Sequence, residues 1–134
     1  MKILALDLGD QWVGVAISDA LCMIARPYKT VTNRELNSFL ENLFRQERID
    51  TVLVGYPKTM RGTESDQTKK IVLKKEELEK KFSEKKWLLC DERLTSKQAL
   101  SMGKMKDKLE IHARSAALIL ESYLLHLQFQ KSLE

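Results

Sequence analysis

Runs of apolar residues separated by short turns predict three strands in the first part of the chain. Residues 3–8 are apolar except for an acid at position 7, and residues 13–18 follow a glycine-containing turn, which predicts a hairpin. Residues 24–31 predict a third strand, and Pro27 near its start indicates a position at the edge of a sheet. The three strands are therefore expected to form an antiparallel meander.

Helices and strands alternate in the rest of the chain. Thr32-Asn-Arg-Glu35 matches a capping box, and the apolar residues after it recur at helical spacing to about residue 48. This order predicts an α/β fold with a mixed five-stranded sheet, antiparallel on one side and parallel on the other, with helices on both faces. The later elements are predicted at 51–55 (strand), 66–84 (helix), 87–90 (strand), 95–102 (short helix) and 110–128 (helix).

The composition is that of a soluble globular domain. The chain has 134 residues, 43% of them hydrophobic and 31% charged, so one domain spanning 1–134 is expected and a disordered or fibrous chain is excluded. No apolar run approaches the roughly 18 residues of a membrane span, and the N-terminus lacks a signal-peptide pattern. Cys22 and Cys90 form no CxxC pair, which favours reduced thiols and a cytoplasmic location.

Positive charge is concentrated in the second half of the chain. Residues 1–57 carry 6 basic and 7 acidic residues, whereas 58–86 carry 10 and 6, and 93–109 carry 5 and 1. Two adjacent acids, Asp91 and Glu92, lie between the two basic segments. Carboxylates surrounded by basic residues suit a metal-using enzyme that acts on a polyanion such as nucleic acid. A solvated Lys/Glu helix face is the plainer interpretation of the first basic segment.

Acidic residues end two of the predicted strands. Asp7 ends the first strand, and Asp91 and Glu92 end the strand at 87–90. If these strands lie side by side in a parallel sheet, their carboxyl ends form one ligand-binding rim. Clustered carboxylates suit Mg²⁺ or Mn²⁺, and two such ions about 4 Å apart support phosphodiester hydrolysis. The alternative is that these acids cap turns or pair with Arg93.

Four sequence blocks along the whole chain resemble the motifs of one protein family. The blocks are Asp7-x-Gly9 with Val13-Gly-Val-Ala-x-Ser-Asp19, Val54-Gly55-x-Pro57 with Met60-x-Gly62-Thr63-Glu64, Asp91-Glu-Arg-Leu-Thr95, and Ala116-Ala-Leu-Ile-Leu120 with Tyr123-Leu124. With these blocks the chain resembles the YqgF family, also called RuvX, of RNase H-like nucleases. The resemblance implies an RNase H-like fold and a divalent-metal-dependent endonuclease that trims the 5′ end of precursor 16S ribosomal RNA, in contact with ribosomal particles. The family was earlier linked to Holliday junction resolution by analogy with RuvC.

The resemblance also implies which residues are catalytic. Asp7 would be the first metal ligand, and Glu92 or its neighbour Asp91 the second acid. The third acid of the family falls on His112, which is a departure, because an imidazole can bind a metal or relay a proton but carries no negative charge. We therefore expect weaker Mg²⁺ binding, a preference for Mn²⁺ and loss of activity when His112 is protonated. The alternative is a solvent-facing histidine without a role.

Candidate substrate contacts surround these residues. Glycines and a Pro/Gly loop can offer backbone amides to phosphate, and basic side chains near the acids can hold a nucleic-acid strand. Arg93 and Thr95 directly follow the acids, whereas Lys104 and Lys106 belong to a basic loop. The full set is Gly9, Ser18, Gly55, Pro57, Gly62, Arg93, Thr95, Lys104 and Lys106.

Three functions remain open at this point. The first is an RNA-processing nuclease. The second is a resolvase of branched DNA, which would require a two-fold homodimer rather than a monomer. The third is a non-catalytic RNA-binding factor of ribosome assembly, which His112 and the unusual Gln11-Trp12 hairpin would favour. A further alternative, an actin-like nucleotide-binding domain, rests only on Asp7-x-Gly9 and is not counted among the three.

Overall fold

The fold was analysed in a computed structural model, which describes residues 1–56, 66–91 and 108–133. The order of elements agrees with the prediction, and the short helix expected at 95–102 lies outside the described residues. The elements are β1 (Lys2–Leu8), β2 (Trp12–Ser18), β3 (Ala25–Thr32), α1 (Leu36–Gln46), β4 (Ile49–Tyr56), α2 (Asp66–Lys81), β5 (Lys86–Asp91) and α4 (Lys108–Leu133).

The strands form one five-stranded mixed sheet in the order β3-β2-β1-β4-β5. The β1–β2 and β2–β3 pairs are antiparallel, whereas β1–β4 and β4–β5 are parallel, as predicted. Strand β3 lies at the edge, where Pro27 is tolerated opposite Ala16 beside a register shift. Strand β1 is central and is covered on both faces.

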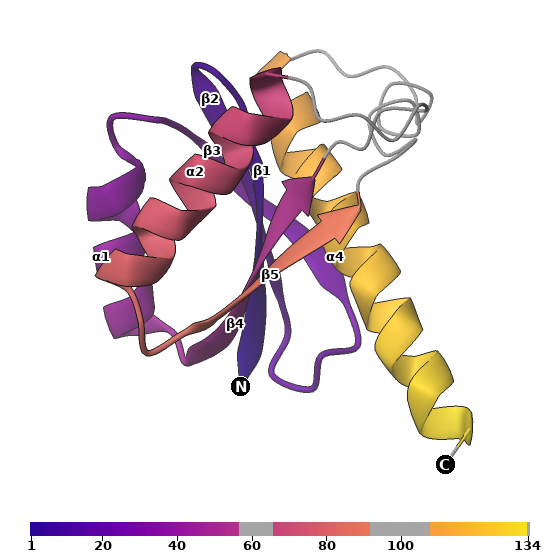
Figure 1. The fold of residues 1–134 in the computed structure, drawn as a ribbon. Coiled ribbons are helices and arrows are strands. Elements are labelled where there is room, and N and C mark those ends of the chain that lie inside the picture. Colours follow the sequence, from indigo (N-terminus) through magenta and orange to yellow (C-terminus); the bar gives the residue numbers. More distant parts are fainter. Residues whose placement is uncertain (57–65, 92–107, 134) are drawn as a thin grey trace.

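Helices cover both faces of the sheet, with α1 and α2 on one side and α4 on the other (Figure 1). Leu4, Leu6 and Leu8 of β1 pack in the cluster that includes residues of α1 and α2. Ile3 and Ala5 of the same strand pack against the small and apolar residues of α4. Because side chains alternate along a strand, Asp7 belongs to the face that α4 covers.

The first and second helices pack through narrow apolar stripes. In α2 the buried residues are Ile71 and Leu78, and Phe82 follows directly after the helix. The buried indole of Trp87 in β5 donates a hydrogen bond of 3.0 Å to the carbonyl of Phe82, which ties the end of α2 to the sheet. Among the described helices, none is long and apolar enough to cross a membrane.

The capping box expected at Thr32 is only half realised. The Thr32 hydroxyl accepts a hydrogen bond from the Glu35 amide at 3.2 Å, as the pattern requires. Residues 33–35 form a turn, however, and α1 begins at Leu36 with Glu35 as its N-cap. The turn places Asn33 beside the β1–β2 connection, where it contacts the backbone of that turn.

Candidate functional site

The parallel strands β1, β4 and β5 end at one edge of the sheet. Leu6 of β1 lies opposite Val54 of β4, so Asp7 is one residue beyond that pair. Tyr56 at the end of β4 lies opposite Asp91, the last residue of β5. Neighbouring strands are about 4.8 Å apart, which places the backbones of β1 and β5 about 10 Å apart at this rim. The predicted meeting of these two strand ends is confirmed at the level of the backbone.

Asp7 faces helix α4. Its partner across the β1–β2 ladder is Gly14, and residues that are directly opposite in an antiparallel pair share a face. A Cβ atom on Gly14 would overlap the carbonyl of His112 and lie 2.9 Å from the amide nitrogen of Ala113. Helix α4 therefore crosses the sheet at Gly14, directly beside Asp7. The close approach at Gly14 is made by a helix and not by the other side of the hairpin.

The crossing places the backbone of His112 over Gly14, the residue paired with Asp7. His112 is half-buried in the first half of α4. The contact itself is between α4 and β2. Within the residues that the structure describes, no group of three or more His, Cys, Asp or Glu side chains could hold a metal. Glu92 lies outside those residues.

Gly55 separates Asp7 from the end of β5 on the same face of the sheet. Leu53 packs in the α4 cluster, so Gly55, two residues later, belongs to the same face and lies opposite Cys90. Having no side chain, Gly55 leaves the middle strand bare between the two neighbouring strand ends. Burial raises the pKa of the Cys90 thiol to about 11, so the thiol is protonated at neutral pH and adds no charge there.

Ser18, an expected substrate contact, is not brought to the rim at which Asp7 lies. Because β2 runs antiparallel to β1, Ser18 lies at the opposite edge of the sheet from Asp7. Its hydroxyl is buried, accepts a hydrogen bond from the Ile3 amide at 2.8 Å and donates one to the Asp19 carbonyl at 3.0 Å. Ser18 therefore joins the ends of β1 and β2 and has a structural role.

Asp19 also has a structural role at that edge. Its carboxylate accepts hydrogen bonds from the amides of Ile24 at 3.0 Å and Met23 at 2.7 Å. These two amides, Ile24 foremost, hold the pKa of Asp19 below its usual value. The conformation of the turn also includes Cys22 at a φ of 56°. The second half of the first sequence block thus shapes a turn away from the rim.

Gly9 lies at the rim and forms the tight hairpin that was expected. Its amide donates to the Trp12 carbonyl at 3.0 Å, and a Cβ atom on Gly9 would lie 2.7 Å from that carbonyl oxygen. The remaining expected substrate contacts lie outside the described residues, namely Pro57, Gly62, Arg93, Thr95, Lys104 and Lys106.

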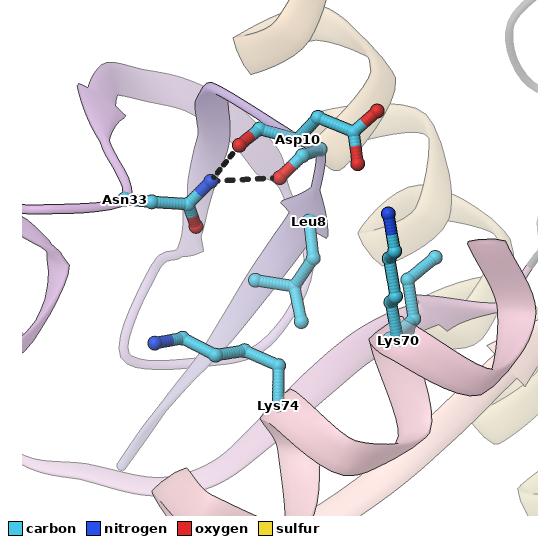
Figure 2. Close-up of a pocket in the computed structure, with 7 residues that line it drawn as sticks. Leu8, Asp10, Asn33, Lys70 and Lys74 are labelled. Atoms are coloured by element: carbon cyan, nitrogen blue, oxygen red, sulfur yellow. Dashed lines mark hydrogen bonds between the residues drawn. The ribbon is translucent and has the colours of Figure 1, made fainter. Parts of the chain in front are cut away.

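A cavity beside the β1–β2 turn was not anticipated from the sequence. It has a volume of about 310 Å³ and lies between the turn and α2, with Lys70, Lys74 and Asn33 among its lining residues (Figure 2). The charged sequence of α2 had favoured a solvated helix face. One sequence feature could have indicated the cavity. Lysines occupy positions 74 and 75, one helical turn after Ile71, where the apolar stripe of the helix would be expected to continue.

Known proteins resemble this chain over nearly its whole length. A family described as "RuvX: Holliday junction resolvase" matches residues 1–126. A protein of Christiangramia forsetii is 41% identical over 92% of this chain and 97% of its own length, and carries the name "Putative pre-16S rRNA nuclease". A protein of the same name from Rubrobacter xylanophilus is 37% identical over 92% of this chain and 91% of its own length.

Solved structures share the fold at low sequence identity. RuvC of T. thermophilus, in complex with a Holliday junction substrate, superposes with a TM-score of 0.59 and 17% identity, covering 96% of each chain. The fowlpox virus resolvase, also in a junction complex, gives a TM-score of 0.55 and 15% identity over 95% of this chain and 99% of its own. These similarities confirm the RNase H-like fold that the sequence blocks implied. Because the family match and the relatives extend along nearly the whole chain, the protein belongs to the RuvX family.

Proposed function

We propose that this protein is a divalent-metal-dependent nuclease that hydrolyses phosphodiesters in structured RNA, and that its substrate is the 5′ end of precursor 16S ribosomal RNA. The observation that most supports this proposal is the crossing of α4 at Gly14. It places the His112 backbone over the residue paired with Asp7, at the edge of the sheet where β5 ends. Relatives named as pre-16S rRNA nucleases support the substrate. Both cysteines are free, which fits a reducing, cytoplasmic compartment.

The donor set around Asp7 fits Mg²⁺ or Mn²⁺. Carboxylate oxygens of Asp7 and Glu92 suit hard divalent cations, and the imidazole of His112 favours Mn²⁺ over Mg²⁺. A divalent cation there would supply Lewis acidity and a nucleophile from water at neutral pH. In this proposal Asp7 and Glu92 bind the cation, and His112 completes the site from α4. The bare backbone at Gly55 leaves room between β1 and β5 for the cation and the scissile phosphate.

We propose Glu92, and not Asp91, as the second acid. Trp87 packs on the α1/α2 side of β5, whereas Leu88 and Cys90 pack on the α4 side with Asp7. If the alternation continued past Cys90, residue 92 would be the next position on the Asp7 side, which supports the choice of Glu92. The sequence left the two acids open, because 87–90 is apolar on both faces.

Exchanging each acid in turn tests that assignment. Glu92→Gln should lower the cleavage rate by about 10³-fold, since loss of a metal ligand removes several kcal/mol of transition-state stabilisation. Asp91→Asn should lower it by less than about tenfold, because only screened electrostatics change. Single-turnover rates at saturating Mn²⁺ would measure both. The reverse ranking would assign the role to Asp91.

Restoring an acid at the third position should strengthen Mg²⁺ binding. His112→Asp adds a negative charge to the site, so the Mg²⁺ concentration for half-maximal cleavage should fall by at least about tenfold. His126→Asp is the matched control, because His126 is exposed further along the same helix. Equal metal dependence in the two variants would remove His112 from the site.

Side-by-side cleavage assays discriminate the substrates. The purified protein would be incubated with a labelled precursor 16S fragment and with a labelled four-way DNA junction, with Mn²⁺, with Mg²⁺ and with EDTA. Cutting of the RNA extension that EDTA abolishes is the expected result. Symmetric cutting of the junction alone would favour the resolvase, whose family description and RuvC-like fold make it the second candidate. Salt-sensitive RNA binding without turnover would identify an assembly factor instead.

A further inference from the structure

The cavity between the β1–β2 turn and α2 has an apolar floor and a polar rim. Leu8 and Ile71 form the floor. Lys70 extends from α2 toward Asp10, and Lys74 extends past Leu8 on the side of Asn33 (Figure 2). Its volume of about 310 Å³ is about ten times the roughly 30 Å³ that one water occupies in the liquid. The cavity opens at the same edge of the sheet at which β1 ends, because Gly9 and Asp10 belong to its lining.

Lys74 is placed where a helix normally buries an apolar residue. It lies one turn from Ile71 and its side chain is only 30% exposed. Its ion pair with Glu77 is 3.9 Å long, and the side chain of Glu77 is 73% exposed, so the charge of Lys74 is weakly compensated. The neighbouring Lys75, by contrast, pairs with Glu79 at 3.2 Å. The aliphatic part of Lys74 covers the floor while its ammonium group reaches the cavity.

The wall opposite the lysines is held in a fixed shape. The side-chain amide of Asn33 donates to the Gly9 carbonyl at 2.8 Å and to the Asp10 carbonyl at 2.7 Å (Figure 2). The backbone N–H of Asn33 also donates a hydrogen bond to the Gln11 carbonyl at 3.1 Å. A turn fixed by three hydrogen bonds offers a preorganised surface, which lowers the entropic cost of binding.

The charges in the cavity suit a singly charged anion. Lys70 and Lys74 contribute two positive charges and Asp10 contributes one negative charge, so the lining carries a net single positive charge. One phosphodiester carries one negative charge, whereas a nucleoside triphosphate would bring several next to Asp10. Asp10 thus favours a backbone phosphate over a highly charged small ligand.

The cavity and Asp7 lie on opposite faces of the end of β1. Leu8 packs on the α2 side, whereas Asp7 belongs to the α4 side, and the β1–β2 turn lies between them. A nucleic-acid strand that crosses this turn would present successive backbone phosphates to both faces. We propose that the cavity is a second phosphate-binding site, in which Lys70 and Lys74 hold a backbone phosphate of the strand whose scissile phosphate lies at Asp7. This proposal rests on the proposed nuclease function.

Binding without cleavage tests the second site. The affinity for a labelled RNA hairpin with a single-stranded 5′ extension would be measured in EDTA over a range of salt concentrations. The double variant Lys70→Gln/Lys74→Gln should weaken binding about tenfold and reduce the slope of log K against log salt by about one unit, as for loss of a phosphate contact. Lys80→Gln/Lys86→Gln, which removes two exposed lysines away from the cavity, should leave both quantities near the wild-type values.

Other outcomes separate this proposal from the function on which it rests. Lys70→Arg/Lys74→Arg should recover most of the affinity, which a merely misfolded cavity would not do. If the wild type cleaves RNA but the two glutamine pairs bind it equally, the second site is refuted while the nuclease function stands. If inorganic phosphate binding depends on Lys70 and Lys74 but RNA binding does not, the cavity is a site for a free anion, and the proposal is overturned. If the wild type neither binds nor cleaves RNA, both proposals fail.

Discussion

Asp7→Asn should reduce the cleavage rate by at least about 10³-fold while the protein remains folded. Asparagine matches aspartate in size but lacks the negative charge that a divalent cation requires, and the cation accounts for several kcal/mol of transition-state stabilisation. The variant should still unfold cooperatively in urea in EDTA, because asparagine has nearly the same volume as aspartate. Single-turnover cleavage at saturating Mn²⁺ and urea unfolding in EDTA would measure the two effects.

Asp50→Asn provides the matched control. Asp50 is exposed at the start of β4, the opposite end of the strand from the rim, and the substitution removes the same charge. It should cleave at close to the wild-type rate. Cleavage by Asp7→Asn at the rate of this control would eliminate Asp7 as a metal ligand and, with it, the proposed site.

Gly14→Ala should destabilise the protein by about 3 kcal/mol and reduce cleavage per folded molecule. The new methyl group would overlap the carbonyl of His112, and that carbonyl belongs to helix backbone that cannot rotate away as a side chain can. Overpacking of a tight contact costs about 1–3 kcal/mol, and α4 must move away from β2 to relieve it. Urea unfolding would measure the loss of stability, and cleavage rates corrected for the folded fraction would measure displacement of His112.

A second substitution at the same position separates steric from chemical effects. Gly14→Ser adds a Cβ atom, as alanine does, and a hydroxyl group. If the steric overlap is the cause, serine should lower the stability at least as much as alanine. Wild-type stability in both variants would mean that α4 does not cross the sheet at Gly14. If stability falls but cleavage per folded molecule does not, the crossing of α4 at Gly14 is not required for the catalytic site.

The order of strands and helices could be predicted because local patterns carry it. The runs at 3–8 and 13–18 are apolar enough to require burial, and the turn between them dictates a hairpin. The face on which Asp7 lies could not be predicted, since β1 is buried on both sides and its pattern does not alternate. That information comes from the pairing with Gly14 and from the position of α4, which are long-range features.

Two positions in the structure differ from the sequence-based picture. Ser18 belongs to the same sequence block as Asp7, but an antiparallel hairpin places the ends of its two strands at opposite edges of the sheet. The charge of α2 favoured a solvated face, whereas Lys74 lies one turn from Ile71 at the edge of a cavity. The position of Ser18 follows from topology, but the cavity depends on the turn that Asn33 holds.

The crossing of α4 over Gly14 can form only late in translation, because α4 is the last of the described elements to be synthesised. The two proposed site residues beside this crossing, Asp7 and His112, come from the first strand and from the last helix of the described chain. During synthesis the N-terminal meander can form early, as N-terminal segments generally do. The catalytic site proposed here would nevertheless remain incomplete until His112 had been translated, so nascent chains would stay inactive toward the ribosomal RNA surrounding them.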